Sequence, residues 1–231
     1  MAEETELRLY GEIGPSFFGM IDDVSVIRAL DELRDSRKIH VRLNSPGGDY
    51  FMGVSISNAL RRHPAKVIVH VDALAASAAS VVAMGGDRVI MHPGSLMMVH
   101  RAWTIAMGNQ EDLAKVAETL GKVDSNLIDV YHTRTGLDKG KLKTLVDAET
   151  WMSGDEAVQL GFADETDSAP TGAQAKVPDG WYARTPNTID RYTLAASARS
   201  IPSLTIAAKA SPQDTARKAQ WEKLKKTLRV A

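Results

Sequence analysis

Cysteine is absent from all 231 residues, and aromatic residues make up only 6% of the chain. Without cysteine the protein forms no disulfide bond and offers no thiolate ligand to zinc or to an iron–sulfur cluster. No run of about 18 apolar residues occurs, so the sequence predicts no membrane-spanning helix. Lys and Arg total 28 against 29 Asp and Glu, and this net charge of −1 gives no signal for binding nucleic acid or a membrane surface.

The length and the first residues set two further bounds. A chain of this size can bury one sizeable core and carry a small appendage. It starts Met1-Ala2-Glu3-Glu4-Thr5-Glu6, which is acidic and lacks the basic and then apolar pattern of a secretion signal. We therefore expect a cytoplasmic protein. No motif predicts a metal site or a cofactor.

Residues 7–164 alternate between strand and helix patterns. Apolar runs predict strands at 7–10, 39–43, 67–71, 88–91 and 96–99. Helical spacing predicts helices near 26–33 and 52–60, a helix of small residues over 77–84, and a long amphipathic helix over about 110–135 that ends at Gly136. Repeated β-α-β order indicates an α/β fold with a largely parallel sheet and right-handed crossovers.

The composition changes from about residue 165, where Pro, Ala, Ser and Thr become frequent. We predict one domain over residues 1–164 and a flexible tail over 165–231. The last stretch, Arg217–Arg229, carries six basic residues and one acid and is predicted to form a basic helix. That helix is either a solvated surface helix or a docking peptide for a partner.

Ser77 is the candidate nucleophile. It follows the strand at 67–71 and opens the helix of small residues, so its Oγ would lie at a helix N-terminus that favours developing negative charge. Ser80, about one turn further along, is the rival. Alone, a serine among alanines is equally consistent with a small residue that packs in a core.

A serine nucleophile needs a base, and the base needs a carboxylate to orient it. His100 follows the apolar strand at 96–99, where an imidazole can project into a site, whereas His40 and His70 lie inside strands and are predicted to be structural. The candidate acids are Asp147 and Glu149, and their spacing does not choose between them. Either is equally read as an exposed acid in a loop.

The oxyanion of an acyl transfer needs backbone N–H donors. The Pro46-Gly47-Gly48 turn can present them because glycine has no Cβ to block close approach. Gly48 and Ala78, the residue after the candidate nucleophile, are the predicted donors. A plain turn is the alternative for the glycine pair.

Four ordered motifs together resemble the ClpP-type serine proteases over roughly residues 7–164. They are Asn44-Ser45-Pro46-Gly47-Gly48, Ala75-Ala76-Ser77, Met97-Met98-Val99-His100, and Trp151-Met152-Ser153 followed by Glu156-Ala157-Val158 and Gly161. The resemblance implies a ClpP/crotonase-like fold, a superhelix of β-α-β repeats with a long handle helix. It also implies homo-oligomeric rings that cleave protein substrates.

The resemblance assigns roles to the candidate residues. Ser77 becomes the nucleophile, His100 the general base, and the amides of Gly48 and Ala78 the oxyanion hole. The family's aspartate falls on Glu149, three residues before Met152, so this chain has a glutamate there, and Asp147 stays as the runner-up acid.

In three features the chain departs from the bacterial housekeeping enzymes and resembles the ClpP-related head maturation proteases of phages and prophages. Arg101-Ala102 stands where those enzymes usually carry Gln-Pro, the segment before Asn44 is short for the loops that face an ATPase ring, and the chain runs well past Gly161. The likeness implies ATP-independent cleavage of capsid and scaffold polypeptides, and of the chain's own tail, inside an immature capsid in the host cytoplasm.

Four other functions stay open from the sequence. One is a housekeeping subunit of an ATP-dependent Clp protease. Another is a crotonase-like acyl-CoA enzyme that uses carboxylates. A third is a Ser-Lys dyad peptidase, which the absence of lysine between Lys66 and Lys115 disfavours. The fourth is an inactive scaffold protein, which the glutamate at 149 keeps open.

Overall fold

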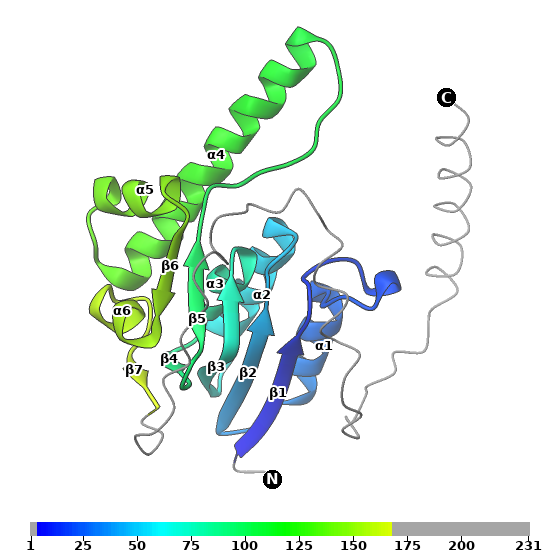
Figure 1. Cartoon of the computed structure of the whole chain (residues 1–231). Helices are drawn as coiled ribbons and strands as arrows, with labels where there is room; N and C mark the ends of the chain where they lie inside the picture. Colours follow the sequence, from blue (N-terminus) through cyan, green and yellow to red (C-terminus); the bar gives the residue numbers. More distant parts are fainter. Residues whose placement is uncertain (1–3, 168–231) are drawn as a thin grey trace. The chain divides into compact units, whose positions relative to one another are not determined.

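The computed structural model describes residues 4–167 (Figure 1). Almost all of the predicted tail, including the basic stretch at its end, lies outside the described residues. The elements in chain order are β1 (Glu4–Tyr10), the short 3-10 helix η1 (Ser16–Phe18), α1 (Asp23–Glu32), β2 (Lys38–Ser45), α2 (Tyr50–Arg62), β3 (Lys66–Ala76), α3 (Ala78–Ala83), β4 (Arg88–Met91), β5 (Leu96–Val99), α4 (Gln110–Thr135), α5 (Lys139–Asp147), β6 (Thr150–Ser153), α6 (Gly154–Gln159) and β7 (Glu165–Thr166).

The sheet is parallel through five strands in the order β1-β2-β3-β4-β7. Strand β3 runs five residues beyond the predicted strand at 67–71, because its final residues Leu74–Ala76 pair with β5 while its earlier residues pair with β4. Strand β5 also pairs antiparallel with β6. The predicted α/β fold with a largely parallel sheet is confirmed, and β7 extends the sheet just past the predicted domain limit at 164.

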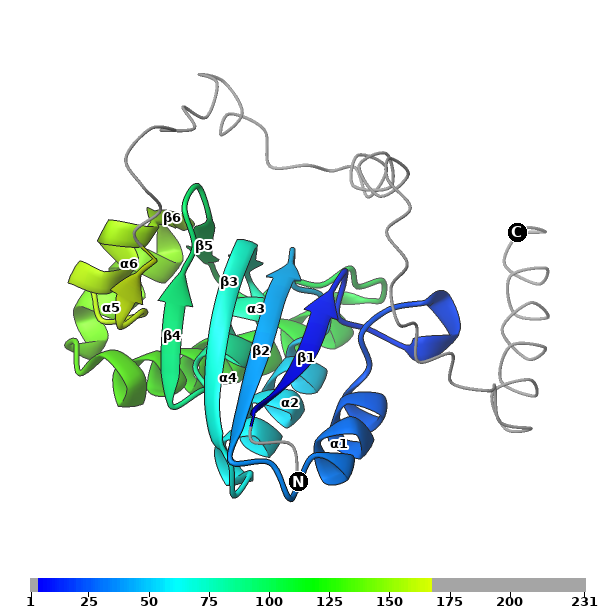
Figure 2. The same ribbon diagram turned by 90° about the horizontal axis from the view of Figure 1, so that it is seen from below.

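Helices α1 and α2 cover one face of the sheet (Figure 2). All six residues of α3 are buried, and small side chains let this helix pack closely against α2. The predicted buried helix of small residues is therefore confirmed. Its first residue follows directly after Ser77, so the core fixes the backbone on which that serine lies.

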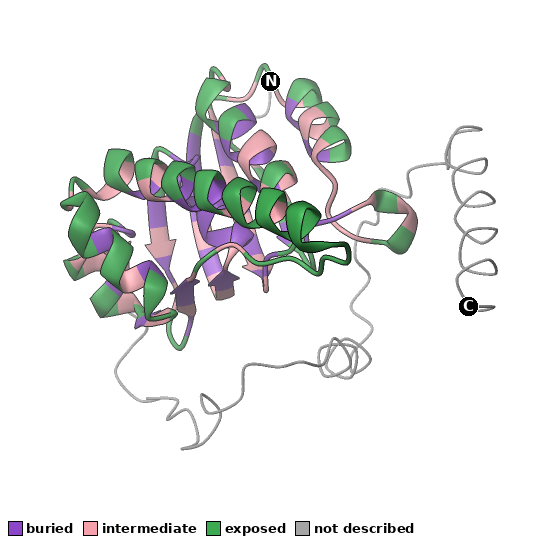
Figure 3. Cartoon of the chain, turned by 90° about the horizontal axis from the view of Figure 1, so that it is seen from above, coloured by how far each residue is buried: buried purple, intermediate pink, exposed green. Residues whose placement is uncertain are grey.

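Helix α4 is the predicted long helix, and only its second half belongs to the core. It starts at a capping box formed by Asn109 and Asp112 and ends at Gly136, which adopts a left-handed conformation. Its buried residues begin at Val123, and the first half projects from the rest of the domain and is largely exposed (Figures 1 and 3). No helix in the described part of the chain has the length and apolar character needed to cross a membrane.

The face of the sheet opposite α1 and α2 is polar. Along β2 burial alternates residue by residue: Ile39, Val41 and Leu43 are buried, whereas His40 and Arg42 lie half-buried on the other face. Parallel sheets are usually covered by helices on both faces and then read as continuous apolar runs. The alternation in this sheet places polar side chains on the face that no helix of residues 4–167 covers, here called the open face.

Candidate active site

The pairing of three strands brings the candidate residues together. Ala76 pairs with Met98, and Val99 pairs with Thr150. Ser77, His100 and Glu149 are the next residues beyond those pairs, so they extend from the neighbouring ends of β3, β5 and β6. The sheet therefore places these three residues, which are far apart in the sequence, at one edge.

Ser77 occupies a strained turn between β3 and α3. Its φ of 54° is positive, which is uncommon for a residue with a Cβ and costs about 1–3 kcal/mol. The turn is held on both sides: the N–H of Ser77 donates to the carbonyl of Met98 at 3.0 Å, and the N–H of Ser80 donates to the carbonyl of Ser77 at 2.9 Å. This sharp turn places the Ser77 hydroxyl beside His100.

The Oγ of Ser77 lies 2.7 Å from Nε2 of His100. The hydroxyl donates to this nitrogen when the imidazole is neutral and protonated on Nδ1. Burial lowers the pKa of His100, and the negative charges of Glu149 and Asp124 act in the opposite direction. A partly buried imidazole that is neutral near pH 7 is suited to accept the serine proton.

The two candidate acids differ in what they contact. Asp147 pairs with Lys143 and lies 3.7 Å from Arg101, and the hydrogen bond from Lys143 is the main reason that its pKa is lowered. Glu149 has a positive φ of 49°, and its charge is the main one acting on His100. Glu149 and His100 are both described by the structure, and no hydrogen bond joins them. The carboxylate therefore acts on the imidazole through its charge alone.

The glycine turn packs directly against the candidate nucleophile. A Cβ on Gly47 would lie 2.7 Å from the Cβ of Ser77, and one on Gly48 would lie 2.0 Å from the carbonyl oxygen of Ile13. Within residues 4–167, neither Gly48 nor Ala78 donates its N–H to a backbone carbonyl. Both predicted donors are therefore available to an oxyanion beside Ser77.

Ser80, the rival nucleophile, is fully buried. Its Oγ lies 2.7 Å from the hydroxyl of Tyr131 and donates to the carbonyl of Ser77 at 2.6 Å. Both contacts are internal to the core, so this hydroxyl stabilises the turn at Ser77 and faces no substrate.

Sequence reasoning missed one charged residue near His100. Asp124 on α4 is the only charged residue among those that the described structure buries. It accepts hydrogen bonds from Arg101 and from the N–H of Ala102, the two residues after His100. The sequence analysis assigned it no role, because no signal in the sequence pairs this position of the long helix with the segment after β5.

Comparison with known proteins decides the family. A family model described as Clp protease matches residues 3–168, which is most of the chain. This chain belongs to the Clp protease family. It is a serine peptidase, as the sequence resemblance predicted, and the family match disfavours the crotonase-like acyl-CoA enzyme.

Individual relatives agree with the family match. The chain is 31% identical over 144 residues to the ATP-dependent Clp protease proteolytic subunit of Deinococcus radiodurans, covering 62% of this chain and 71% of the relative. The protein of the same name from Leuconostoc citreum is 28% identical over 158 residues, covering 67% and 78%. The structure of a point mutant of ClpP1 from Listeria monocytogenes superposes with a TM-score of 0.63 at 20% identity, covering 71% and 92%, and shows the shared fold.

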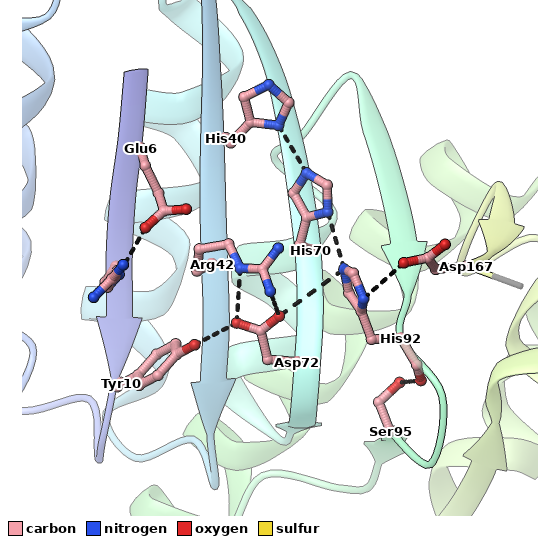
Figure 4. Close-up of polar contacts among 10 residues, drawn as sticks. Glu6, Tyr10, His40, Arg42, His70, Asp72, His92, Ser95 and Asp167 are labelled. Atoms are coloured by element: carbon pink, nitrogen blue, oxygen red, sulfur yellow. Dashed lines mark hydrogen bonds and ion pairs between the residues drawn. The ribbon is translucent and has the colours of Figure 1, made fainter. Parts of the chain in front are cut away.

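A second cluster of titratable residues lies on the open face of the sheet (Figure 4). Three histidines, on β2, on β3 and directly after β4, form a ladder: Nδ1 of His40 is 2.8 Å from Nε2 of His70, and Nδ1 of His70 is 3.1 Å from Nε2 of His92. Glu4 lies 3.3 Å from His40 at one end, and Asp167 lies 3.1 Å from His92 at the other. The prediction that His40 and His70 are structural agrees with this arrangement.

The number of N–H groups that the ladder needs can be counted from its contacts. Its four contacts each need one N–H, because a carboxylate stands at both ends and only accepts. Three neutral imidazoles carry three N–H groups. A fully paired ladder therefore holds one extra proton. Burial, followed by the positive charge of Arg42, lowers the pKa of His70 to about 4, so the central ring stays neutral.

The lowered pKa of His70 predicts a loss of stability in mild acid. The unfolded chain binds a proton at this histidine near pH 6.5 and the folded chain only near pH 4, so this contribution is complete above pH 6.5 and is lost as the pH falls toward 4. Between pH 7.5 and pH 5 we expect a loss of about 1 kcal/mol, after allowance for the partial exposure of the ring. Urea unfolding at both pH values should show a smaller loss in His70→Ile than in the wild type. An equal loss in both proteins would contradict this assignment.

Proposed function

We propose that Ser77, His100 and Glu149 form the catalytic triad of an endopeptidase, with the N–H groups of Gly48 and Ala78 as its oxyanion hole. The observation that carries the proposal is the 2.7 Å contact between Ser77 Oγ and His100 Nε2 at the ends of neighbouring strands. A nucleophile within hydrogen-bond reach of its base is the first geometric requirement of this chemistry.

The proposed reaction is acyl transfer. His100 takes the Ser77 proton on Nε2 as Oγ attacks the peptide carbonyl, and the carbonyl oxygen gains a negative charge that the two N–H groups stabilise. The imidazolium then gives its proton to the leaving amine as the C–N bond breaks. Water, deprotonated by His100, hydrolyses the ester on Ser77 and releases the second product. As the bond between Oγ and the acyl carbon breaks, His100 returns the proton to Oγ and the free serine is restored.

Glu149, rather than Asp147, is proposed to orient His100. Replacing Glu149 by Gln removes the charge that stabilises the imidazolium, and we expect kcat/KM for a peptide substrate to fall by about 10²–10⁴-fold. Asp147→Asn is the matched control, because Asp147 contacts Lys143 and Arg101 and not His100, and it should change kcat/KM less than about threefold. A larger loss in Asp147→Asn than in Glu149→Gln would exchange the two roles.

Assembly into rings is proposed to complete the site. Apolar side chains stand exposed in the segment before α4 and on its first turn: Trp103, Ile105, Met107 and Leu113, with Met107 94% exposed. Grouped exposed apolar residues mark interaction surfaces, and the family resemblance places ring contacts at the handle helix. Since Glu149 is not hydrogen-bonded to His100 in the single chain, contacts between copies of the chain are proposed to close the triad.

The proposed substrates are capsid and scaffold polypeptides of a phage or prophage, together with the chain's own tail, cut without an ATPase in the host cytoplasm or within an immature capsid. Arg101-Ala102 after His100 and the long stretch that follows Gly161 support this subtype. The names of the relatives favour a second candidate, a proteolytic subunit that works with an ATP-driven partner. An inactive scaffold role is the third outcome.

One incubation separates these candidates. The purified protein and its Ser77→Ala variant are mixed with the cognate capsid and scaffold polypeptides, with and without a Clp-type ATPase and ATP, and the products are followed by intact mass spectrometry. Cleavage by the wild type alone, without ATP, supports maturation. Cleavage that needs the ATPase supports the second candidate. No cleavage in any mixture, with Ser77 unreactive, contradicts the proposed peptidase.

A further inference from the structure

Both residues that follow His100 are tied to one buried carboxylate. Oδ2 of Asp124 accepts from Nε of Arg101 at 2.9 Å, and Oδ1 accepts from the N–H of Ala102 at 2.8 Å. The Asp124 side chain is only 13% exposed, whereas that of Arg101 is 60% exposed. The carboxylate thus reaches from the buried half of α4 to the chain just beyond β5.

A buried carboxylate is costly unless each oxygen is paired. Here the two oxygens are satisfied by a guanidinium and a backbone amide, and bonds of this charge-assisted kind are among the strongest in proteins. Both donors belong to a segment without regular structure, since β5 ends at Val99 and α4 does not begin until Gln110. Asp124 is therefore an anchor for a segment that no strand or helix holds, immediately after His100.

Arg101, which Asp124 holds, also lies near one of the two candidate acids. Arg101 also lies 3.7 Å from Asp147, which is the last residue of α5 and stands two residues before Glu149. The charge of Asp124 also acts on His100 itself, where it raises the pKa that burial lowers. One carboxylate thus influences the position of the base and its proton affinity.

We propose that Asp124 is a positioning residue for His100: by holding Arg101 and Ala102 it fixes the imidazole against Ser77, and its charge stabilises the imidazolium formed during peptide hydrolysis. This inference rests on the proposed triad and adds a residue to it. Asp124 touches neither substrate nor Oγ and acts only through His100.

The variant Asp124→Asn tests the proposal, because it keeps the shape of the side chain and removes its charge. We expect kcat/KM to fall by about 10–100-fold, as for a misplaced base. The acidic limb of the pH profile of kcat/KM should move to lower pH, since removing a nearby negative charge lowers the pKa of His100. Asp129→Asn, an exposed position on the same helix that pairs with Lys139, is the matched control and should change neither quantity.

Histidine NMR gives a readout that does not depend on activity. The titration of the His100 ring, assigned by comparison with His100→Gln, should shift to lower pH in Asp124→Asn and stay unchanged in Asp129→Asn. A shifted titration in a protein with no peptidase activity would mean that the proposed function fails while the influence of Asp124 on His100 stands. An unchanged titration, or a loss of kcat/KM that only matches a loss of folded protein, would overturn the positioning role.

If Asp124→Asn does not fold, Arg101→Gln carries the test. It removes the exposed partner and leaves the amide of Ala102 bonded to Asp124. We expect kcat/KM to fall by about 3–10-fold, with the unfolding temperature of the variant within a few degrees of that of the wild type. Unchanged kcat/KM in this variant would overturn the proposal.

Discussion

Replacing Ser77 by alanine is expected to lower kcat/KM for peptide hydrolysis by about 10⁴–10⁶-fold while leaving the protein folded. The hydroxyl is the only group that the proposed mechanism uses to form a covalent bond, and removing a triad nucleophile costs about this much in serine peptidases. Alanine lacks only the Oγ that contacts His100. The measurement is steady-state hydrolysis of a fluorogenic peptide.

The control for this variant is Ser125→Ala on α4, where the exposed hydroxyl bonds only to the carbonyl of Gly121 in its own helix. It should hydrolyse the peptide at the wild-type rate. Circular dichroism spectra of the wild type, Ser77→Ala and Ser125→Ala should be the same, which checks that all three proteins are equally folded. If Ser77→Ala retained more than about a tenth of the wild-type kcat/KM, Ser77 would not be the nucleophile.

The second large effect is expected at the glycine turn. Gly48 has a φ of +135°, and an added Cβ would lie 2.0 Å from the carbonyl oxygen of Ile13. Gly48→Ala must therefore move the turn and with it the N–H proposed to bind the oxyanion. Losing one such donor lowers kcat by about 10²–10³-fold, and the strained backbone costs about 1–3 kcal/mol of stability.

Gly121→Ala is the control for a glycine-to-alanine change that neither moves an oxyanion donor nor strains the backbone. A Cβ on Gly121 meets no atom within 4 Å, and alanine favours a helix interior by about 0.5–1 kcal/mol over glycine. This control should be fully active and slightly more stable. The Gly48→Ala kinetics are taken well below its own unfolding temperature, so that lost activity reports on the oxyanion donor. Wild-type kcat in folded Gly48→Ala would remove Gly48 from the proposed hole.

The sequence allowed the fold and the placement of the candidate residues to be predicted because both depend on local signals. Alternating apolar residues marked the strands, and the Gly47-Gly48 pair and Ser77 each follow a strand and precede a helix. When such strands lie side by side in a parallel sheet, their carboxyl ends share one edge. The contact between Ser77 and His100 follows from that geometry, although 23 residues separate them in the chain.

Other features depend on how distant segments meet, and one sequence carries little signal for that. A charged residue of an amphipathic helix is usually solvated, yet Asp124 is buried because the second half of α4 packs over the segment after His100. The ladder of His40, His70 and His92 depends on the register of three strands. Spacing did not separate Asp147 from Glu149, whereas the antiparallel pairing of β5 with β6 places Glu149 opposite His100.

The most direct test of the central claim is covalent labelling of Ser77. The wild type, Ser77→Ala and His100→Ala are each incubated with a fluorophosphonate probe at neutral pH, and the intact masses are measured over time. A serine that His100 activates predicts one added probe per chain in the wild type, none in Ser77→Ala, and labelling slowed by about 10²-fold or more in His100→Ala. Equal masses for wild type and Ser77→Ala, or equal labelling rates with and without His100, would contradict the account.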